Sequence, residues 1–133
     1  MGVFVWPVPG FSRVTSGFRT AQRPNHNGID IGRCLAPPKP IEGAEVVAVA
    51  AGFVSKAGRN HASMGNWLEL EHCGGWVSRY MHNDVNFAFE GLYVAQGDVI
   101  ALVGSTGRST APHLHVELLR HGLHVDPALW LGV

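Results

Sequence analysis

Short runs of apolar and β-branched residues recur along this chain about every eight to twelve residues, separated by turn segments rich in glycine and proline. No stretch repeats its apolar residues with the period of about 3.6 residues that marks an amphipathic helix. This pattern is typical of an all-β sandwich or barrel. A short edge segment at 4–8, an irregular segment at 34–43 and one helical turn at 126–130 are also expected. The predicted strands lie at residues 13–18, 28–32, 45–55, 67–72, 76–82, 99–104 and 113–119.

The chain has 133 residues, which most economically form a single domain with its own core. Ten Lys and Arg side chains balance ten Asp and Glu side chains, so the formal net charge is zero. A protein whose main partner is a nucleic acid or an anionic membrane surface needs a basic patch, and this balance argues against both. No apolar run approaches the roughly 20 residues of a membrane-spanning helix.

The first residues lead straight into an apolar segment, Phe4-Val5-Trp6, without the basic region and apolar core of a secretory signal peptide. A chain that begins in this way looks like a domain taken from a longer protein. We therefore expect residues 1–133 to be one domain of a larger parent, and we expect it to be monomeric.

The two cysteines, Cys34 and Cys73, lack the Cys-x-x-Cys spacing of a zinc knuckle. They could form one disulfide in an oxidising compartment or remain two unrelated thiols. Because both follow the ends of predicted strands, a disulfide that staples the fold is a reasonable hypothesis.

The segment from Ala111 to Glu117 places two histidines, two positions apart, in an apolar run that ends on a carboxylate. Successive side chains of a strand point to opposite faces, so His113, His115 and Glu117 would share one face. Three polar groups on one face of an apolar strand indicate a site. A half-exposed edge strand is an equally good interpretation of a lone His-x-His pair.

A second polar group lies in His26-Asn27-Gly28-Ile29-Asp30, where a loop enters a predicted strand. Imidazole nitrogens and carboxylate oxygens bind zinc at about 2.0–2.2 Å, and two ligands four positions apart can converge across a glycine-bearing bend. One further ligand from the His-x-His pair would leave a fourth position open for water, as in catalytic zinc sites. The alternative is a loop histidine beside an aspartate that caps a turn.

Together these motifs resemble the lysostaphin/LytM-type zinc endopeptidases, a family that cuts peptide bonds in bacterial peptidoglycan. The resemblance covers nearly the whole chain, and motif order and spacing agree. The chain departs from the family pattern at Ala111 and Cys73, where glycine is commoner, at Met81, where a small residue is frequent, and at Cys34. The matching pieces are His26-x-Gly28-x-Asp30, Tyr80-Met81-His82, the run from Gly104 to His113-Leu114-His115, Trp6-Pro7-Val8, Ser16-Gly17-Phe18 and Val125-Asp126-Pro127.

The resemblance implies one zinc ion per chain, with His26, Asp30 and His115 as its ligands. It also implies that His82 and His113 are the catalytic pair, beside the water that the metal activates. An imidazole there can orient or deprotonate the water, or stabilise the oxyanion when protonated. The sequence leaves open which of the two is the general base, and a strand-end histidine that bonds a carbonyl is the alternative for His82.

The remaining polar candidates are given supporting or surface roles. Glu117 lies one step beyond the implied ligand and is expected to support it or to face solvent. His61 lies in a polar loop where it could contact substrate. His72, His121 and His124 occupy predicted turns and are expected to be surface or capping residues.

The family fold implied by the resemblance is an open antiparallel β structure with a long substrate groove and little helix. Loops at residues 19–27, 58–66 and 83–93 would form the groove walls. Five aromatic residues could line the groove or the core, and the core is the more frequent place for aromatic residues in strands. They are Trp67, Trp76, Phe87, Phe89 and Tyr93.

The implied activity is zinc-dependent hydrolysis of peptide bonds in peptidoglycan cross-links or stem peptides, outside the cell or in the cell wall, by a secreted or virion-borne protein. The alternative is a non-catalytic relative that binds cell wall or regulates another hydrolase. Such relatives lose metal ligands, whereas all five expected positions are present here. A β domain with a structural metal is disfavoured because structural zinc usually has four protein ligands. The sequence does not identify the bond that is cut.

Overall fold

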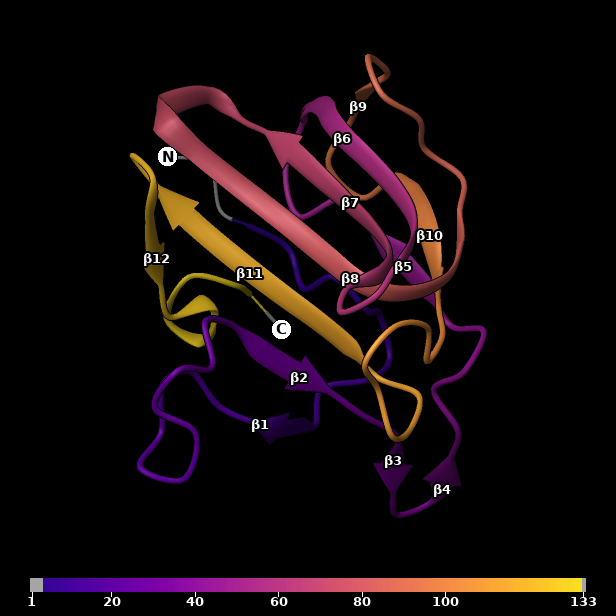
Figure 1. The fold of residues 1–133 in the computed structure, drawn as a ribbon. Coiled ribbons are helices and arrows are strands. Elements are labelled where there is room, and N and C mark those ends of the chain that lie inside the picture. The colour runs from indigo at the N-terminus through magenta and orange to yellow at the C-terminus, as the bar shows by residue number, and fades with distance from the viewer. Residues whose placement is uncertain (1–3, 133) are drawn as a thin grey trace.

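The computed structural model describes residues 4–132, which form twelve β-strands (Figure 1). Its helical segments within these residues are two three-residue 3-10 turns, η1 (Cys73–Gly75) and η2 (Pro127–Leu129). The predicted all-β fold with little helix is therefore confirmed. The strands are β1 (Val14–Ser16), β2 (Ile29–Ile31), β3 (Cys34–Leu35), β4 (Pro38–Lys39), β5 (Glu45–Val47), β6 (Gly52–His61), β7 (Gly65–Glu71), β8 (Trp76–Asn86), β9 (Tyr93–Val94), β10 (Val99–Val103), β11 (Leu114–Arg120) and β12 (Leu123–Val125).

Ten strands form one open antiparallel sheet, in which β11 lies between β2 and β8 (Figure 1). The main path runs β1-β2-β11-β8-β7-β6-β9, with β12 paired to β11 and β10 paired to both β5 and β8. The short strands β3 and β4 form a separate hairpin. Short connections join β6 to β7, β7 to β8 and β11 to β12, as antiparallel neighbours allow.

β8 changes its pairing partner along its length, and this change makes room for a site. Its first half pairs with β11 as far as Met81, which lies opposite His115. Its second half pairs with β10 from Asn83 onward. Segment 104–113, which joins β10 to β11, therefore leaves the sheet beside His82, the residue at the change of partner.

The alternation along β11 agrees with the prediction. Leu114, Val116 and Leu118 are buried in the core, and His115 and Glu117 lie on the other face. Burying a Leu or Val side chain is worth about 1.5–3 kcal/mol. A slip of one residue would expose all three apolar side chains and cost several times that amount, so the core fixes the face on which His115 lies.

Two predicted boundaries are wrong. The predicted strand 45–55 is two strands, β5 and β6, because the chain turns at 48–51 and moves from pairing with β10 to pairing with β7 and β9. The predicted loop 58–66 is largely strand, since β6 continues to His61 and β7 begins at Gly65. Its polar side chains indicated a loop, but they are the exposed side chains of a hydrogen-bonded hairpin.

The segment 4–8, expected at an edge, packs on the core instead. Phe4 forms an isolated bridge with Leu131, and Trp6 and Val8 are buried. Pro7 and Pro9 exclude a regular strand here but not burial.

Two short segments remain. Segment 34–43, predicted to be irregular, contains the β3–β4 hairpin. The predicted helical turn at 126–130 is confirmed as η2, where the Asp126 side chain accepts from the N–H of Ala128. Across the described residues, no helix is long and apolar enough to cross a membrane.

Both cysteines are free, so the disulfide hypothesis is wrong. Cys34 lies in β3, whereas Cys73 lies in the connection between β7 and β8. These two elements are at opposite ends of the molecule (Figure 1). A position after a strand end does not by itself bring two cysteines together.

The expectation that the aromatic residues lie in the core is wrong for three of the five. Phe87, Phe89 and Tyr93 are 52%, 63% and 58% exposed. They follow the end of β8 or lie in β9, the last strand of the main path, where no further strand covers them. Trp67 and Trp76 are half-buried.

Candidate active site

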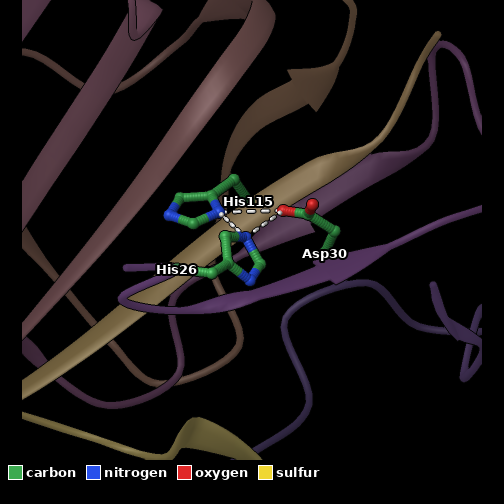
Figure 2. A group of neighbouring side chains, drawn as sticks. All are labelled: His26, Asp30 and His115. Atoms are coloured by element: carbon green, nitrogen blue, oxygen red, sulfur yellow. Dashed lines mark hydrogen bonds and ion pairs between the residues drawn. The ribbon is translucent and has the colours of Figure 1, made fainter. Parts of the chain in front are cut away.

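Three side chains that can bind a metal converge from three different segments (Figure 2). Asp30 is at the centre of β2 and His115 is in β11, where they are direct partners across the antiparallel pair. His26 lies in the loop before β2. His115 Nδ1 is 2.8 Å from Asp30 Oδ1 and 3.2 Å from His26 Nε2, which is 3.3 Å from the same oxygen. The structure thus brings together the three residues named from the sequence.

Hydrogen bonds on the far side of each ring fix which nitrogens carry protons. His26 Nδ1 is 2.7 Å from the carbonyl oxygen of Gly17, which can only accept, so this nitrogen donates. His115 Nε2 donates in the same way to a carboxylate oxygen of Glu117 at 2.9 Å. The other nitrogen of each ring therefore turns a lone pair toward Asp30 and toward the other ring. Three lone pairs at one place repel each other unless a proton or a metal ion lies between them.

The surrounding charges favour a cation at this point. Burial acts to raise the pKa of Asp30, but the hydrogen bond and charge of His115, with the charges of His113 and His26, bring it to about 2. Burial acts to lower the pKa of His115, but hydrogen bonds and charges from Asp30 and Glu117 outweigh it and raise the pKa to about 9. Asp30 therefore stays ionised, and His115 lies where a positive charge is stabilised, so the same surroundings attract a metal ion.

The donor set fits zinc. Two imidazole nitrogens and one carboxylate oxygen are ligands that zinc accepts, and catalytic zinc sites use three protein ligands with one open position. Among the described residues, the group able to share one ion consists of these three side chains. The arrangement therefore matches a catalytic site better than a structural site with four protein ligands.

Gly28 allows the His26 loop to lie directly against β11. A Cβ atom at this position would be 2.3 Å from the carbonyl oxygen of Val116 and 3.0 Å from side-chain atoms of His115 and Glu117. The first of these contacts is with backbone, which cannot move aside without disturbing the β2–β11 pairing. The central glycine of the His-x-Gly-x-Asp motif is required for this close approach.

The two histidines implied as a catalytic pair lie beside the three candidate metal ligands. The rings of His82 and His113 have centroids 4.8 Å apart, and His113 Nε2 is 3.7 Å from Asp30 Oδ1. Each Nδ1 atom faces a backbone carbonyl oxygen at 2.8 Å, that of Thr106 for His82 and that of Ala111 for His113. Both rings therefore donate through Nδ1, which leaves Nε2 free to accept a proton.

His82 occupies a strained backbone position. Its φ of 69° lies in the left-handed region, which costs a non-glycine residue about 1–3 kcal/mol and is found most often at functional sites. Burial lowers the pKa of His82, the charges of His113 and His115 lower it further, and the bond to Thr106 opposes them. The ring is therefore neutral at neutral pH, in the form that accepts a proton.

Thr106 is a supporting residue that the sequence does not reveal. Its hydroxyl donates to the carbonyl oxygen of Asn83 at 2.8 Å and accepts from the N–H of Asn66 at 3.0 Å, while its own carbonyl holds His82. These bonds tie segment 104–113 to β7 and β8. A threonine in a polar loop carries no local signal of contacts to residues so distant in the chain.

Glu117 holds His115 from behind and belongs to a charged row across the sheet. Its carboxylate accepts from His124 at 3.0 Å and from Arg79 at 3.2 Å, and Arg79 also donates to Glu69 at 2.8 Å. Glu117, Arg79 and Glu69 are successive cross-strand partners on β11, β8 and β7. Burial acts to raise the pKa of Glu117, but the bonds and charges of His115 and His124 lower it to about 2, so the carboxylate stays ionised.

The expectation of a surface or capping role is therefore wrong for His124, which is half-buried against Glu117. It is also wrong for His72, whose ring bridges the carbonyl oxygen of Ala51 at 2.7 Å and the hydroxyl of Ser78 at 2.8 Å. The predicted turn is confirmed for His72, which precedes η1, but His124 lies within β12. Turn signals do not show which neighbouring strand the side chain meets.

The two other turn histidines behave more simply. His121 is exposed at the β11–β12 turn, as predicted. His61 Nδ1 accepts from the N–H groups of Ser63 and Met64 and so caps the β6–β7 turn. His61 is not among the residues that line the cleft.

The site forms the floor of a cleft of about 920 Å³. Its walls come from the loop at 23–27, the turn at 63–64 and the segment at 108–110. Two of the three predicted walls are thus found. The third, 83–93, is wrong because the chain after β8 runs along β10, and segment 104–113 borders the cleft instead.

Arg23 orients Asp30 and is a further residue that the sequence did not single out. Its Nη1 donates to Asp30 Oδ2 at 3.1 Å and to the hydroxyl of Ser16 at 2.9 Å. Because this bond uses Oδ2, Oδ1 is left facing the two histidines. The Arg23 side chain is 53% exposed, so its main effect is on geometry rather than on stability.

Residues 24–127 match the family model described as peptidase family M23, and this range contains all five proposed site residues. The chain belongs to peptidase family M23. Its fold and motifs are those of the metallopeptidases that the sequence resembles.

Two curated relatives have different activities in their names. The M23 domain is 35% identical over 129 residues to peptidoglycan DD-endopeptidase ShyB of Vibrio cholerae, a match that covers 91% of this chain and 28% of that protein. It is 34% identical over 126 residues to murein hydrolase activator NlpD of Salmonella dublin, covering 95% of this chain and 30% of that protein. The chain spans less than a third of the length of either relative.

Two solved structures share the fold and detectable sequence identity. A zinc-containing peptidase from Vibrio cholerae superimposes with a TM-score of 0.78 at 34% identity, covering 94% of this chain and 39% of that chain. Lysostaphin from Staphylococcus simulans superimposes with a TM-score of 0.75 at 29% identity, covering 88% and 48%. The resemblance to lysostaphin-type peptidases is confirmed.

Proposed function

We propose that this domain is a zinc-dependent endopeptidase that hydrolyses peptide bonds in bacterial peptidoglycan cross-links or stem peptides. The observation that carries the proposal is the convergence of lone pairs from His26, Asp30 and His115 at the floor of an open cleft. Similarity to a zinc-containing peptidase supports the choice of ion, and similarity to ShyB supports the substrate. The domain would act outside the cell or in the cell wall, where that substrate is found.

In this proposal His26, Asp30 and His115 hold the zinc ion, while His82 and His113 are catalytic. When bound, zinc acts as a Lewis acid that activates water and polarises a peptide carbonyl. Neutral His82, which lines the cleft and has Nε2 free, accepts a proton from the attacking water. The leaving amine needs a proton in turn, which is the proton that His82 has taken from the water. His113, with Nε2 free and its ring centroid 4.8 Å from that of His82, is positioned to accept this proton and pass it to the amine.

The second candidate is a non-catalytic role in activating another cell-wall hydrolase, which the 34% identity to NlpD favours. Two features of this chain support the enzyme instead. All three proposed ligands converge, and His82 is kept in a strained conformation beside them. A protein that only binds another hydrolase needs neither the three converging ligands nor the strained histidine.

The test is digestion of purified sacculi of two cross-link chemistries, with and without a chelator, followed by restoration of zinc. Mass spectra of the released fragments identify the bond. We expect fragment release that the chelator abolishes and zinc restores. His82→Ala should slow release by at least about 10²-fold, as is usual for loss of a general base. His121→Ala, at an exposed turn, is the matched control and should leave the rate unchanged.

Identical fragments from chelated protein or from His115→Ala would show that zinc at this site is not required. An absence of cleavage, together with stimulation of a separately added hydrolase, would favour the activator role.

A further inference from the structure

A second pocket, of about 430 Å³, adjoins the cleft on the side of Asp30 and His113. We call it the arginine pocket, because Arg13, Arg23 and Arg33 all line it. Arg23, Asp30 and His113 line the cleft as well, so the two hollows meet at the proposed reaction centre. A substrate whose scissile bond lies at that junction extends into the arginine pocket on one side only.

Two of the three guanidinium groups have no acidic partner within residues 4–132. Arg23 is paired with Asp30. Arg13, which precedes β1, and Arg33, which follows β2, are exposed and make no ion pair with any described carboxylate. The side chain of Arg13 donates a hydrogen bond to a neutral acceptor, the Arg33 carbonyl oxygen at 3.4 Å.

One acidic side chain, Glu42, also lines this pocket and likewise makes no ion pair with the described residues. Two free guanidinium groups against one carboxylate leave the pocket positive, although the chain as a whole has no net charge. The local excess of positive charge is therefore not a consequence of a basic protein.

Guanidinium groups bind carboxylates through paired, charge-assisted hydrogen bonds. Stem peptides of peptidoglycan carry free carboxylates at their ends and on their acidic residues, whereas glycine bridges carry none within the bridge. The chemistry of the arginine pocket therefore suits a stem-peptide carboxylate close to the scissile bond.

We infer that the arginine pocket is a subsite for a substrate carboxylate on one side of the scissile bond. The inference rests on the proposed function for the identity of the substrate. It narrows the substrate class to peptides that carry a free carboxylate on that side, in preference to uncharged bridge peptides.

The test measures binding by calorimetry to zinc-loaded His82→Ala protein, which is expected to leave the peptides uncut. Three synthetic cross-linked peptides are compared: one with free carboxylates, and two amidated on one or the other side of the cross-link. Amidation on one side should weaken binding about tenfold, which is about 1.4 kcal/mol, and amidation on the other side should change little.

Substitutions that remove a charge from the arginine pocket test whether its positive charge attracts the peptide. Arg13→Gln combined with Arg33→Gln should weaken binding of the carboxylate peptide about tenfold and remove the preference over the amide. Glu42→Gln should tighten it, because a repelling charge is lost. Lys56→Gln combined with Arg59→Gln on β6 removes two charges that line neither hollow and is the matched control. Thermal unfolding of each variant checks that the fold is kept.

Equal binding of all three peptides, no binding of any, or an equal loss in the β6 control would overturn the inference. If Glu42→Gln weakened peptide binding and the arginine substitutions tightened it, the pocket would be a site for a cation. Turnover of the same peptides by the unmodified domain separates the two proposals. Preferential binding without cleavage would count against the proposed activity alone, and cleavage with no carboxylate preference would count against the pocket alone.

Discussion

Each proposed zinc ligand is held by a hydrogen bond on the side away from the metal position. A backbone carbonyl holds His26, Glu117 holds His115 and Arg23 holds Asp30. These bonds select the tautomers and the carboxylate oxygen before any ion arrives. The affinity of the site for zinc should therefore depend on residues that do not touch the metal.

Replacement of Glu117 tests this dependence. Glu117→Ala removes the acceptor that fixes the His115 tautomer and leaves Arg79 with one partner, so zinc affinity should fall about 10–100-fold. Glu117→Gln keeps an acceptor oxygen and should cost less. Competition with a chromophoric chelator measures both. Glu90→Ala, an exposed carboxylate in a loop, is the control. Unchanged affinity in Glu117→Ala would remove Glu117 from the site.

Tyr80 gives a prediction about pH that is independent of the metal. Its ring is completely buried, and its hydroxyl accepts from the N–H of Val49 at 3.1 Å and shares a bond of 2.7 Å with Ser78. Burial raises the pKa of Tyr80 from its ordinary value of 10.0 to about 12, against these bonds. The folded protein holds the phenol proton more tightly, so this contribution is complete below pH 10 and is lost as the pH rises toward 12.

Two pKa units correspond to about 2–3 kcal/mol of unfolding free energy. Urea unfolding of wild type and Tyr80→Phe between about pH 9 and pH 11.5, both with chelator, measures it. We expect Tyr80→Phe to be less stable at pH 9, because the Val49 N–H loses its partner, and the gap to narrow at higher pH. A constant gap would contradict the raised pKa of Tyr80.

At the scale of secondary structure, the site depends on two pairings. The β2–β11 ladder places Asp30 opposite His115, and the change of partner along β8 places His82 beside segment 104–113. Alternation of polar and apolar residues correctly predicts which side chains of β11 share a face, because that signal is local. Neither pairing has a local signal, since Asp30 and His115 are 85 positions apart.

The close approach of the His26 loop to β11 can be tested at Gly28. Gly28→Ala places a Cβ atom against the carbonyl oxygen of Val116, so the loop must shift. We expect a loss of about 1–3 kcal/mol in stability and a marked loss of zinc affinity. Gly17→Ala is the control in the same loop, because its new Cβ would meet only a threonine methyl group, at 3.1 Å. Equal effects of the two changes would contradict the special role of Gly28.

At the scale of the whole molecule, composition and turn spacing predict the all-β class, and the family resemblance carried by the histidine motifs predicts which residues meet. The wrong predictions share one cause. Local pattern predicts the cysteine pair, the wall at 83–93 and the buried place of Phe87, Phe89 and Tyr93, whereas the surroundings of these residues depend on which strands are neighbours. For the same reason, the sequence does not predict the supporting contacts of Thr106, Arg23 and Arg79. Each of these residues connects segments that only the folded sheet brings together.

The division of roles between His115 and His82 is the central claim, and zinc content tests it most directly. Metal analysis of wild type, His115→Ala and His82→Ala after loading and dialysis should find about one zinc ion per chain in wild type and His82→Ala, and little in His115→Ala. Loss of zinc from His82→Ala would make His82 a ligand. Full retention in His115→Ala would mean that the metal site is not the one formed by His26, Asp30 and His115.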